Sequence, residues 1–323
     1  MKNSIKSAKK GEIVTKAVFV ILFMVLAIYA LTMIAMLLWG LLTSLKSSDD
    51  FENLGNVMGL PNLDAGNIFN SRNELFKLSN YKTIIENFLL EKRAVYYGTG
   101  PDLIVHVCKA GFGDMLLNTL LYTVGGALIY ALMPALAAYL CAKYPYKFSS
   151  VLITIYTLMM CMPIVGSMPF ELTFLRNTGL YDNMFGNYLQ KMTGGGMYFF
   201  VYLAYFKGTS EVYREAAQLD GASQMRVMTM IYFPLAVKII STVFLIQFVA
   251  LWNDYQTPLL YLPTHPTLAY GVYYVSYEAF VPAFYHTPVR ISGLMLLAVP
   301  LIIIFAVFKD KLMGDISLGG IKE

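Results

Sequence analysis

The sequence predicts an all-α polytopic membrane protein with six transmembrane helices. Of its 323 residues, 57% are hydrophobic and 14% are charged, whereas about a quarter of the residues in an average soluble domain are charged. The apolar residues gather in uncharged blocks, and a helix needs about 20 apolar residues to cross a bilayer. Composition and block length together exclude a soluble globular domain.

Cysteine and histidine usage excludes two further classes of protein. The three cysteines (Cys108, Cys141 and Cys161) form no C-x-x-C pair, and the three histidines are isolated in the sequence. A disulfide framework or a zinc module needs closely spaced sets of these residues. We therefore expect no metal site and no catalytic residue.

The first helix is predicted at residues 17–42, after a cytoplasmic tail at residues 1–16. The chain carries no charge between Lys16 and Lys46. A secretory signal has an apolar region of only about 7–15 residues, so this longer block is interpreted as an uncleaved anchor.

An extended extracytoplasmic segment is predicted at residues 43–114. It contains the turn-rich stretches Leu60-Pro61-Asn62 and Gly98-Thr99-Gly100-Pro101 and a helical pattern around Tyr81–Lys92. These features favour a small folded cap, and a solvated loop remains the alternative.

A five-helix core is predicted at residues 115–308, followed by a cytoplasmic tail at residues 309–323. The block for the fourth span of the chain, Met197–Phe206, is short unless the helix begins upstream near Asn183, and the block for the fifth span, Ile239–Leu262, contains Asp254 and Pro258. The five blocks are Met115–Ala142, Phe148–Phe170, Met197–Phe206, Ile239–Leu262 and Ile291–Phe308. Most of the basic residues then fall in inner loops and tails, so the positive-inside rule places both termini in the cytoplasm.

The inner segment at residues 208–236 is predicted to form a short helical hairpin. Ser210 can cap a first helix that has Glu211 in its first turn, and Gly221 can end that helix in a left-handed conformation. Ser223 can cap the second helix, and Pro234 lies where the chain enters the next span.

The spacing in this segment resembles the EAA loop of permease subunits of ATP-binding-cassette (ABC) importers, E-A-A-x3-G-x9-I-x-L-P. The matching residues are Glu215-Ala216-Ala217, Gly221, Ile231 and Phe233-Pro234, with Phe233 in place of leucine. Other stretches resemble the maltose-type carbohydrate branch of these permeases: Asn80-Tyr81, Asn118-Thr119, Ala137 to Tyr144, Gly179 to Asn183, and Leu251 to Asp254.

The resemblance implies a transmembrane permease subunit that translocates a carbohydrate, an oligosaccharide or a sugar derivative. Implied partners are a second homologous permease, an ABC ATPase dimer, an extracytoplasmic solute-binding protein and membrane lipid, with no nucleic acid. It also implies a multi-pass protein of a prokaryotic plasma (inner) membrane. The residues expected to couple to the ATPase are Arg214, Glu215, Ala216, Ala217, Leu219, Asp220, Gly221, Ile231 and Pro234.

The chain itself is expected to be non-catalytic. The sequence contains no G-x-x-x-x-G-K-[ST] loop to hold a nucleotide phosphate. Hydrolysis of ATP-Mg is therefore expected in a separate ATPase subunit, and this chain is expected to bind no cofactor. The apolar side of the first inner helix (Val212, Ala216 and Leu219) would enter a groove of that ATPase, with Arg214 and Glu215 fixing the register.

A substrate pathway is predicted around Trp252, Asn253, Asp254 and Tyr255, because polar groups inside a span are costly and often functional. The alternative is that Asp254 marks the outer end of a helix. A peptide, an amino acid or another polar solute remains an alternative cargo. From a different class, an ion-coupled secondary transporter would show inverted repeats and ionisable residues at the midplane.

Overall fold

The computed structural model describes residues 2–61, 77–97, 104–144, 146–161, 167–192, 196–277 and 282–313. The chain divides into two compact units. Unit 1 comprises Met1–Ile84 and Phe280–Leu296, and unit 2 comprises Ile85–Ala279 and Leu297–Glu323.

Unit 1 begins with the long helix α1 (Lys2–Ser44), whose stretch Thr15–Ser44 is long and apolar enough to cross a membrane. Asn80, in α2 (Ser79–Asn87), donates hydrogen bonds of 2.8 Å to the carbonyl oxygens of Ser44 and Lys46. The last carbonyls of a helix have no partner within that helix. Asn80 therefore supplies a partner at the end of α1, and the Tyr81 hydroxyl lies 2.7 Å from Ser44 Oγ.

A carboxylate in unit 1 caps the beginning of α15 (Thr287–Met313). Glu52, in the helical turn η1 (Asp49–Asn53), accepts a 2.9 Å hydrogen bond from the Thr287 amide and lies 2.9 Å from His286 Nδ1. The hydrogen bond with His286, followed by that with Thr287, holds the pKa of Glu52 below its usual value. The short helix η5 (Pro282–Tyr285) precedes this contact.

Unit 2 contains a β-hairpin, which lies in the predicted outer segment. Strand β1 (Leu90–Tyr97) pairs antiparallel with β2 (Ile104–Ala110), with Leu90 opposite Ala110 and an irregularity between Arg93 and Tyr96. The helical pattern predicted around Tyr81–Lys92 is correct only as far as Asn87, the last residue of α2. The remaining residues contribute to a pair of strands that hydropathy alone did not indicate.

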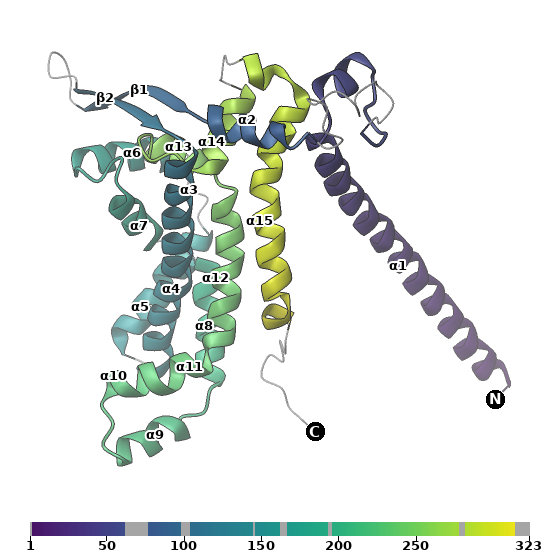
Figure 1. Ribbon diagram of the computed structural model, residues 1–323. Coiled ribbons are helices and arrows are strands. Elements are labelled where there is room, and N and C mark those ends of the chain that lie inside the picture. The colour runs from purple at the N-terminus through teal and green to yellow at the C-terminus, as the bar shows by residue number, and fades with distance from the viewer. Residues whose placement is uncertain are drawn as a thin grey trace. The chain divides into compact units, whose positions relative to one another are not determined.

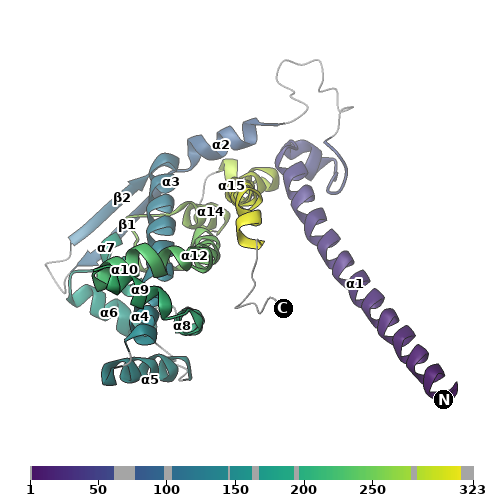
Figure 2. The same cartoon turned by 90° about the horizontal axis from the view of Figure 1, so that it is seen from below.

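A continuous helical run forms the centre of unit 2. It comprises α3 (Phe112–Leu120), the π-helical turn η3 (Leu121–Gly125) and α4 (Gly126–Lys143). Helix α4 packs beside α8 (Gly196–Gly208) and α12 (Val237–Trp252), as both views show (Figure 1, Figure 2). Small side chains on α4 allow this close approach, and the core contains Ala131, Ala135, Ala138, Phe199, Tyr202, Phe206 and Val243.

Four helical stretches within the described residues are long and apolar enough to cross a membrane: Thr15–Ser44, Phe112–Lys143, Gln224–Trp252 and Thr287–Phe308. They correspond to the first, second, fifth and sixth predicted spans. The third predicted span is divided between α5 (Lys147–Cys161) and α6 (Ser167–Asn177). The fourth is divided between α7 (Met184–Met192) and α8, which begins at Gly196.

The bounds predicted for the fifth span were wrong at both ends. The helical run begins at Gln224, passes through α10 (Gln224–Val227), η4 (Met228–Tyr232) and α11 (Phe233–Leu235), and ends with α12. Asp254 lies between α12 and the next helix, α13 (Gln256–Tyr261), and its Oδ1 accepts a hydrogen bond of 3.1 Å from the Thr257 amide in the first turn of α13. The run that begins at Gln224 therefore does not continue to Leu262.

A tight loop connects α6 to α7 and contacts the segment between α13 and α14 (Leu268–Tyr277). Gly179 and Asp182 both have positive φ angles, of 69° and 56°. The Asp182 carboxylate accepts hydrogen bonds from the Thr264 amide (3.0 Å) and the Thr264 hydroxyl (2.7 Å). The stretch from Gly179 to Asn183 thus connects two loops that are distant in sequence.

The predicted tails are described in part. Residues 2–16 continue α1 without a break, and residues 309–313 are the last turn of α15. Residues 314–323 lie outside the described residues.

Candidate coupling site

The inner hairpin has the predicted helix, stop and helix. Helix α9 (Val212–Leu219) is followed by a turn in which Gly221 has a φ of +79°, and then by α10. Ser210 Oγ accepts a 3.3 Å hydrogen bond from the Val212 amide, and Ser223 Oγ accepts one of 3.4 Å from the Arg226 amide. The predicted cap at Ser223 and the left-handed turn at Gly221 are therefore confirmed, whereas the N-cap position of α9 is held by Glu211 and Ser210 lies one residue before it.

One side of the hairpin contacts the core of unit 2, and the other side is exposed. Ala217 and Ala222 pack against the core around Tyr139 and Phe206. Val212 is 66% exposed and Leu219 is 89% exposed. Glu215, Ala216, Asp220 and Pro234 are also exposed, whereas Ile231 is half-buried.

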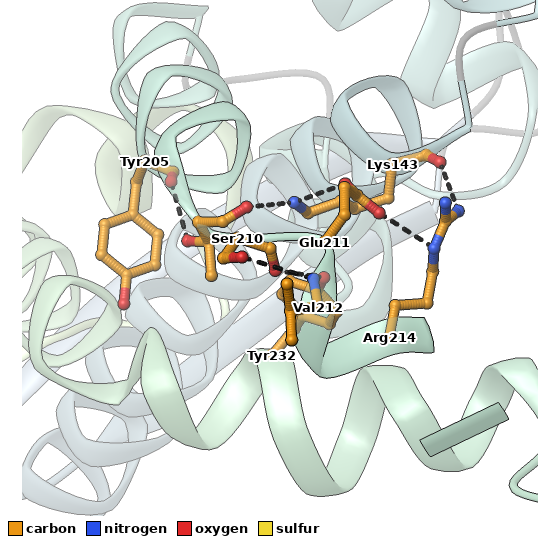
Figure 3. A network of polar contacts seen from close by, with 8 residues as sticks. Lys143, Tyr205, Ser210, Glu211, Val212, Arg214 and Tyr232 are labelled. Atoms are coloured by element: carbon orange, nitrogen blue, oxygen red, sulfur yellow. Dashed lines mark hydrogen bonds and ion pairs between the residues drawn. The ribbon is translucent and has the colours of Figure 1, made fainter. Parts of the chain in front are cut away.

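A polar network attaches the hairpin to the end of α4 (Figure 3). Lys143 Nζ donates hydrogen bonds to the Thr209 carbonyl oxygen (2.7 Å) and to Glu211 Oε1 (2.8 Å). The ammonium group also lies 4.8 Å from the centre of the Tyr232 ring. The Tyr232 hydroxyl donates to the Ser210 carbonyl oxygen at 3.2 Å, so the loop before α9 is held from two sides.

Arg214 belongs to this network through contacts within the chain. Its Nε lies 2.9 Å from Glu211 Oε2, and a terminal guanidinium nitrogen donates to the Lys143 carbonyl oxygen at 3.1 Å. The sequence predicted that Arg214 fixes register against another subunit. Within the chain, Arg214 connects α9 to the last residue of α4, and its role in fixing register stays a prediction.

Sequence reasoning missed Lys143 and Glu211 as members of this site. Lys143 entered the prediction only as an inner charge at the end of an apolar block. Its side chain is 1% exposed, and a lysine is almost never fully buried unless it has a partner. The available signal was a lysine directly after an apolar helix and a glutamate at the start of the EAA helix.

The four predicted pathway residues do not form one site. Trp252 is 3% exposed, and its indole N–H donates to the Leu297 carbonyl oxygen at 3.0 Å. Tyr255 stacks on Tyr273 with ring centres 4.6 Å apart. The Asn253 side chain donates to the Val249 carbonyl oxygen within its own helix.

Asp254 belongs to a second polar network, with residues that the sequence did not single out. The Tyr122 hydroxyl donates to Asp254 Oδ2 at 2.6 Å and accepts from Lys191 Nζ at 3.2 Å. Lys191 also donates to Asn187 Oδ1 at 2.7 Å, and its ammonium lies 4.3 Å from the Tyr122 ring centre. Tyr122 and Lys191 are buried, so a tyrosine hydroxyl bridges two groups that would otherwise be costly inside a membrane protein.

The described part of the chain contains no group of three or more His, Cys, Asp or Glu residues that could hold a metal ion. The long apolar helices define a class of protein, a polytopic helical membrane protein, here with an exposed helical hairpin. The chain belongs to the family of binding-protein-dependent transport system inner membrane components, which matches residues 131–314. It is thus a non-catalytic permease subunit of an ABC importer, which works with an ATPase and a solute-binding protein.

Individual relatives fit this family. The melibiose/raffinose/stachyose import permease protein MelC of Bacillus subtilis is 24% identical over 66% of this chain and 78% of its own length. The probable starch degradation products transport system permease protein AmyC of Thermoanaerobacterium thermosulfurigenes is 27% identical over 64% of this chain and 74% of its own length.

A solved structure shows the same fold. It belongs to a bacterial ABC transporter involved in the import of the acidic polysaccharide alginate, and it matches with a TM-score of 0.69. The match covers 90% of this chain and 95% of the other chain at 20% identity. The family and the fold do not favour an ion-coupled secondary transporter.

Proposed function

We propose that this chain is a permease subunit that translocates a carbohydrate across a prokaryotic plasma (inner) membrane. The carbohydrate is an oligosaccharide or a sugar derivative. A separate ABC ATPase dimer hydrolyses ATP-Mg, and an extracytoplasmic solute-binding protein delivers the sugar. A second homologous permease forms the other half of the pathway. Both termini and the hairpin at α9 and α10 face the cytoplasm.

The observation that carries this proposal is the exposed side of the hairpin. Val212 and Leu219 form an apolar strip that the described part of the chain leaves exposed, beside the exposed carboxylate of Glu215. An amphipathic helix of this kind suits a groove in a partner protein. A separate ATPase is the partner required, because the sequence lacks a phosphate-binding loop of its own.

The cargo is proposed from the relatives. The names of MelC and AmyC refer to melibiose, raffinose and stachyose and to starch degradation products. The maltose/maltodextrin transport system permease protein MalG of Vibrio parahaemolyticus is 27% identical over 62% of this chain and 69% of its own length. These names support a carbohydrate over a peptide, an amino acid or another polar solute.

The decisive experiment is uptake by the complete complex in proteoliposomes. The permease pair, the ATPase and the binding protein are reconstituted with ATP enclosed on the hairpin side, and labelled oligosaccharides, peptides and amino acids are offered with the binding protein. We expect uptake of a sugar that depends on ATP. ATP-dependent uptake of a peptide alone would contradict the cargo, and uptake without the ATPase would contradict the mechanism.

A charge reversal tests the docking surface. Glu215→Lys places a cation on the exposed side of α9, whereas Glu215→Gln keeps the size and removes only the charge. We expect Glu215→Lys to insert normally into the membrane yet to lose ATPase in co-purification, because a stranded partner charge makes reversal harsher than neutralisation. Wild-type association and uptake in Glu215→Lys would remove the main support for this docking surface.

A further inference from the structure

In the proposed function, energy from the ATPase reaches the membrane helices of this chain through the places where the hairpin is attached to them. Helix α9 itself contains no buried residue. Its C-terminal end leads through the Gly221 turn into α10, which continues toward α12. Its N-terminal end follows α8 through a short loop at Thr209–Glu211, and this loop contacts α4 through Lys143.

The contacts of Lys143 form a closed ring between α4 and α9. The Lys143 ammonium contacts Glu211, Glu211 pairs with Arg214 in α9, and Arg214 donates back to the Lys143 carbonyl oxygen. Figure 3 shows these side chains converging on the loop before α9. The Lys143 side chain is 1% exposed, whereas Glu211 and Arg214 are 43% and 26% exposed, so the ring joins a buried ammonium to the partly exposed start of α9.

A simpler role for Lys143 would be to stabilise its own helix. Cations near a helix C-terminus interact favourably with the helix dipole. The Lys143 ammonium, however, donates to the Thr209 carbonyl and to Glu211, both of which belong to the loop before α9. The contact therefore joins two elements that are far apart in the sequence.

We propose that Lys143 is a positioning residue that fixes the coupling hairpin to the inner end of α4, so that a displacement of α9 moves the helix Phe112–Lys143. This inference rests on the proposed function, because it assigns a route for energy that the ATPase supplies. Glu211 and Arg214 are the partners through which Lys143 acts.

Lys143→Met tests this role, since methionine keeps much of the length and removes the ammonium. The matched control is Lys207→Met, because Lys207 is an exposed lysine on the preceding helix α8. In the reconstituted complex we measure ATPase co-purification, ATP hydrolysis and uptake. We expect ATPase association within about twofold of wild type and about tenfold less sugar imported per ATP. A tenfold change is the size expected from the loss of one hydrogen bond to a charged group. Lys207→Met should match wild type.

Two further variants separate positioning from folding. Lys143→Arg keeps a cation that can reach the same acceptors, so it should restore part of the import per ATP. Glu211→Gln should resemble Lys143→Met, and the double variant should be no worse than Lys143→Met, because both act through one contact. Glu211 is partly exposed, so Glu211→Gln tests the same contact if the Lys143→Met protein does not accumulate.

The outcomes that overturn the inference differ from those that overturn the proposed function. Wild-type import per ATP in Lys143→Met, or in Glu211→Gln if Lys143→Met does not accumulate, would refute the positioning role. A fall in import that matches lost ATPase association would also refute it, since Lys143 would then only shape the docking surface. Failure of the unmodified complex to bind the ATPase or to import sugar would instead refute the proposed function.

Discussion

At the scale of single residues, Gly221 is a position where the effect of backbone conformation can be tested apart from the effect of packing. Its φ of +79° lies in the left-handed region, and a Cβ built at this position meets no atom within 4 Å. A substitution here therefore changes the preferred backbone conformation without creating a clash. Non-glycine residues adopt the left-handed region at a cost in free energy, and this cost is small for asparagine.

We expect Gly221→Val to raise the backbone strain energy of the turn between α9 and α10 by about 1–3 kcal/mol. Coupling of ATP hydrolysis to import should fall, whereas membrane insertion should not. Gly221→Asn is the matched control and should retain most of the coupling. Equal behaviour of the two variants, measured as sugar imported per ATP, would show that the left-handed conformation is unimportant.

Tyr122 gives a second prediction at this scale. Tyr122→Phe removes the hydroxyl that Lys191 and Asp254 share, so two polar groups lose a partner. We expect the free energy of unfolding in detergent to fall by about 1–3 kcal/mol. Tyr29→Phe, at an exposed tyrosine in α1, is the control and should change little.

A double-mutant cycle shows whether these residues act together. If Lys191 is stabilised through the Tyr122 hydroxyl, the losses of unfolding free energy caused by Lys191→Met and Tyr122→Phe should be less than additive in the double variant. Strict additivity of the two losses would mean that the hydroxyl and the ammonium are independent.

At the scale of elements, the sequence predicted the hairpin well because its signals are local. Capping serines, a glycine at a helix end and an apolar strip act within a few residues of each other. Both polar networks were missed because they join residues far apart in the chain, Lys143 to Glu211 and Tyr122 to Asp254. Hydropathy marks such residues as charges near helix ends and does not show which of them meet.

The contact that begins α15 gives a pH-dependent prediction. Glu52 has a lowered pKa in the folded chain because it accepts hydrogen bonds from His286 and Thr287. Its contribution to local stability is therefore fully present above its unfolded pKa of about 4.3 and is lost as the pH falls through the lower folded value.

We expect amide hydrogen exchange at residues 286–290, corrected for its intrinsic pH dependence, to accelerate as the pH falls below about 4. Glu52→Gln keeps the shape of the side chain and removes the titration. It should show the faster exchange already at neutral pH and no acid step. An acid step of the same size in Glu52→Gln would assign the effect to another group.

At the scale of the whole molecule, the helix Phe112–Lys143 contacts both polar networks of unit 2. Tyr122 lies in its η3 turn, and Lys143 is its last residue. Composition sufficed to predict a helical membrane protein, and apolar blocks located four of the six spans as continuous helical runs. The β-hairpin was not predicted, because a short pair of strands outside the apolar blocks carries little hydropathy signal.

Orientation across the membrane is the remaining prediction at this scale, and it follows from the basic residues near the predicted inner ends. In a background with Cys108, Cys141 and Cys161 replaced by alanine, a single cysteine is introduced by Met58→Cys or by Leu219→Cys. Met58 is 82% exposed in the predicted outer segment, and Leu219 is 89% exposed on the coupling hairpin.

With the outer wall layers opened, an impermeant thiol reagent should label Met58→Cys in intact cells. Leu219→Cys should react only after the membrane is broken, because the reagent cannot reach the cytoplasmic face. Both side chains are exposed in this chain, and the cells lack the partner ATPase, so burial cannot account for a difference between them. Labelling of Leu219→Cys in intact cells, with Met58→Cys protected, would reverse the orientation and place the hairpin out of reach of any cytoplasmic ATPase.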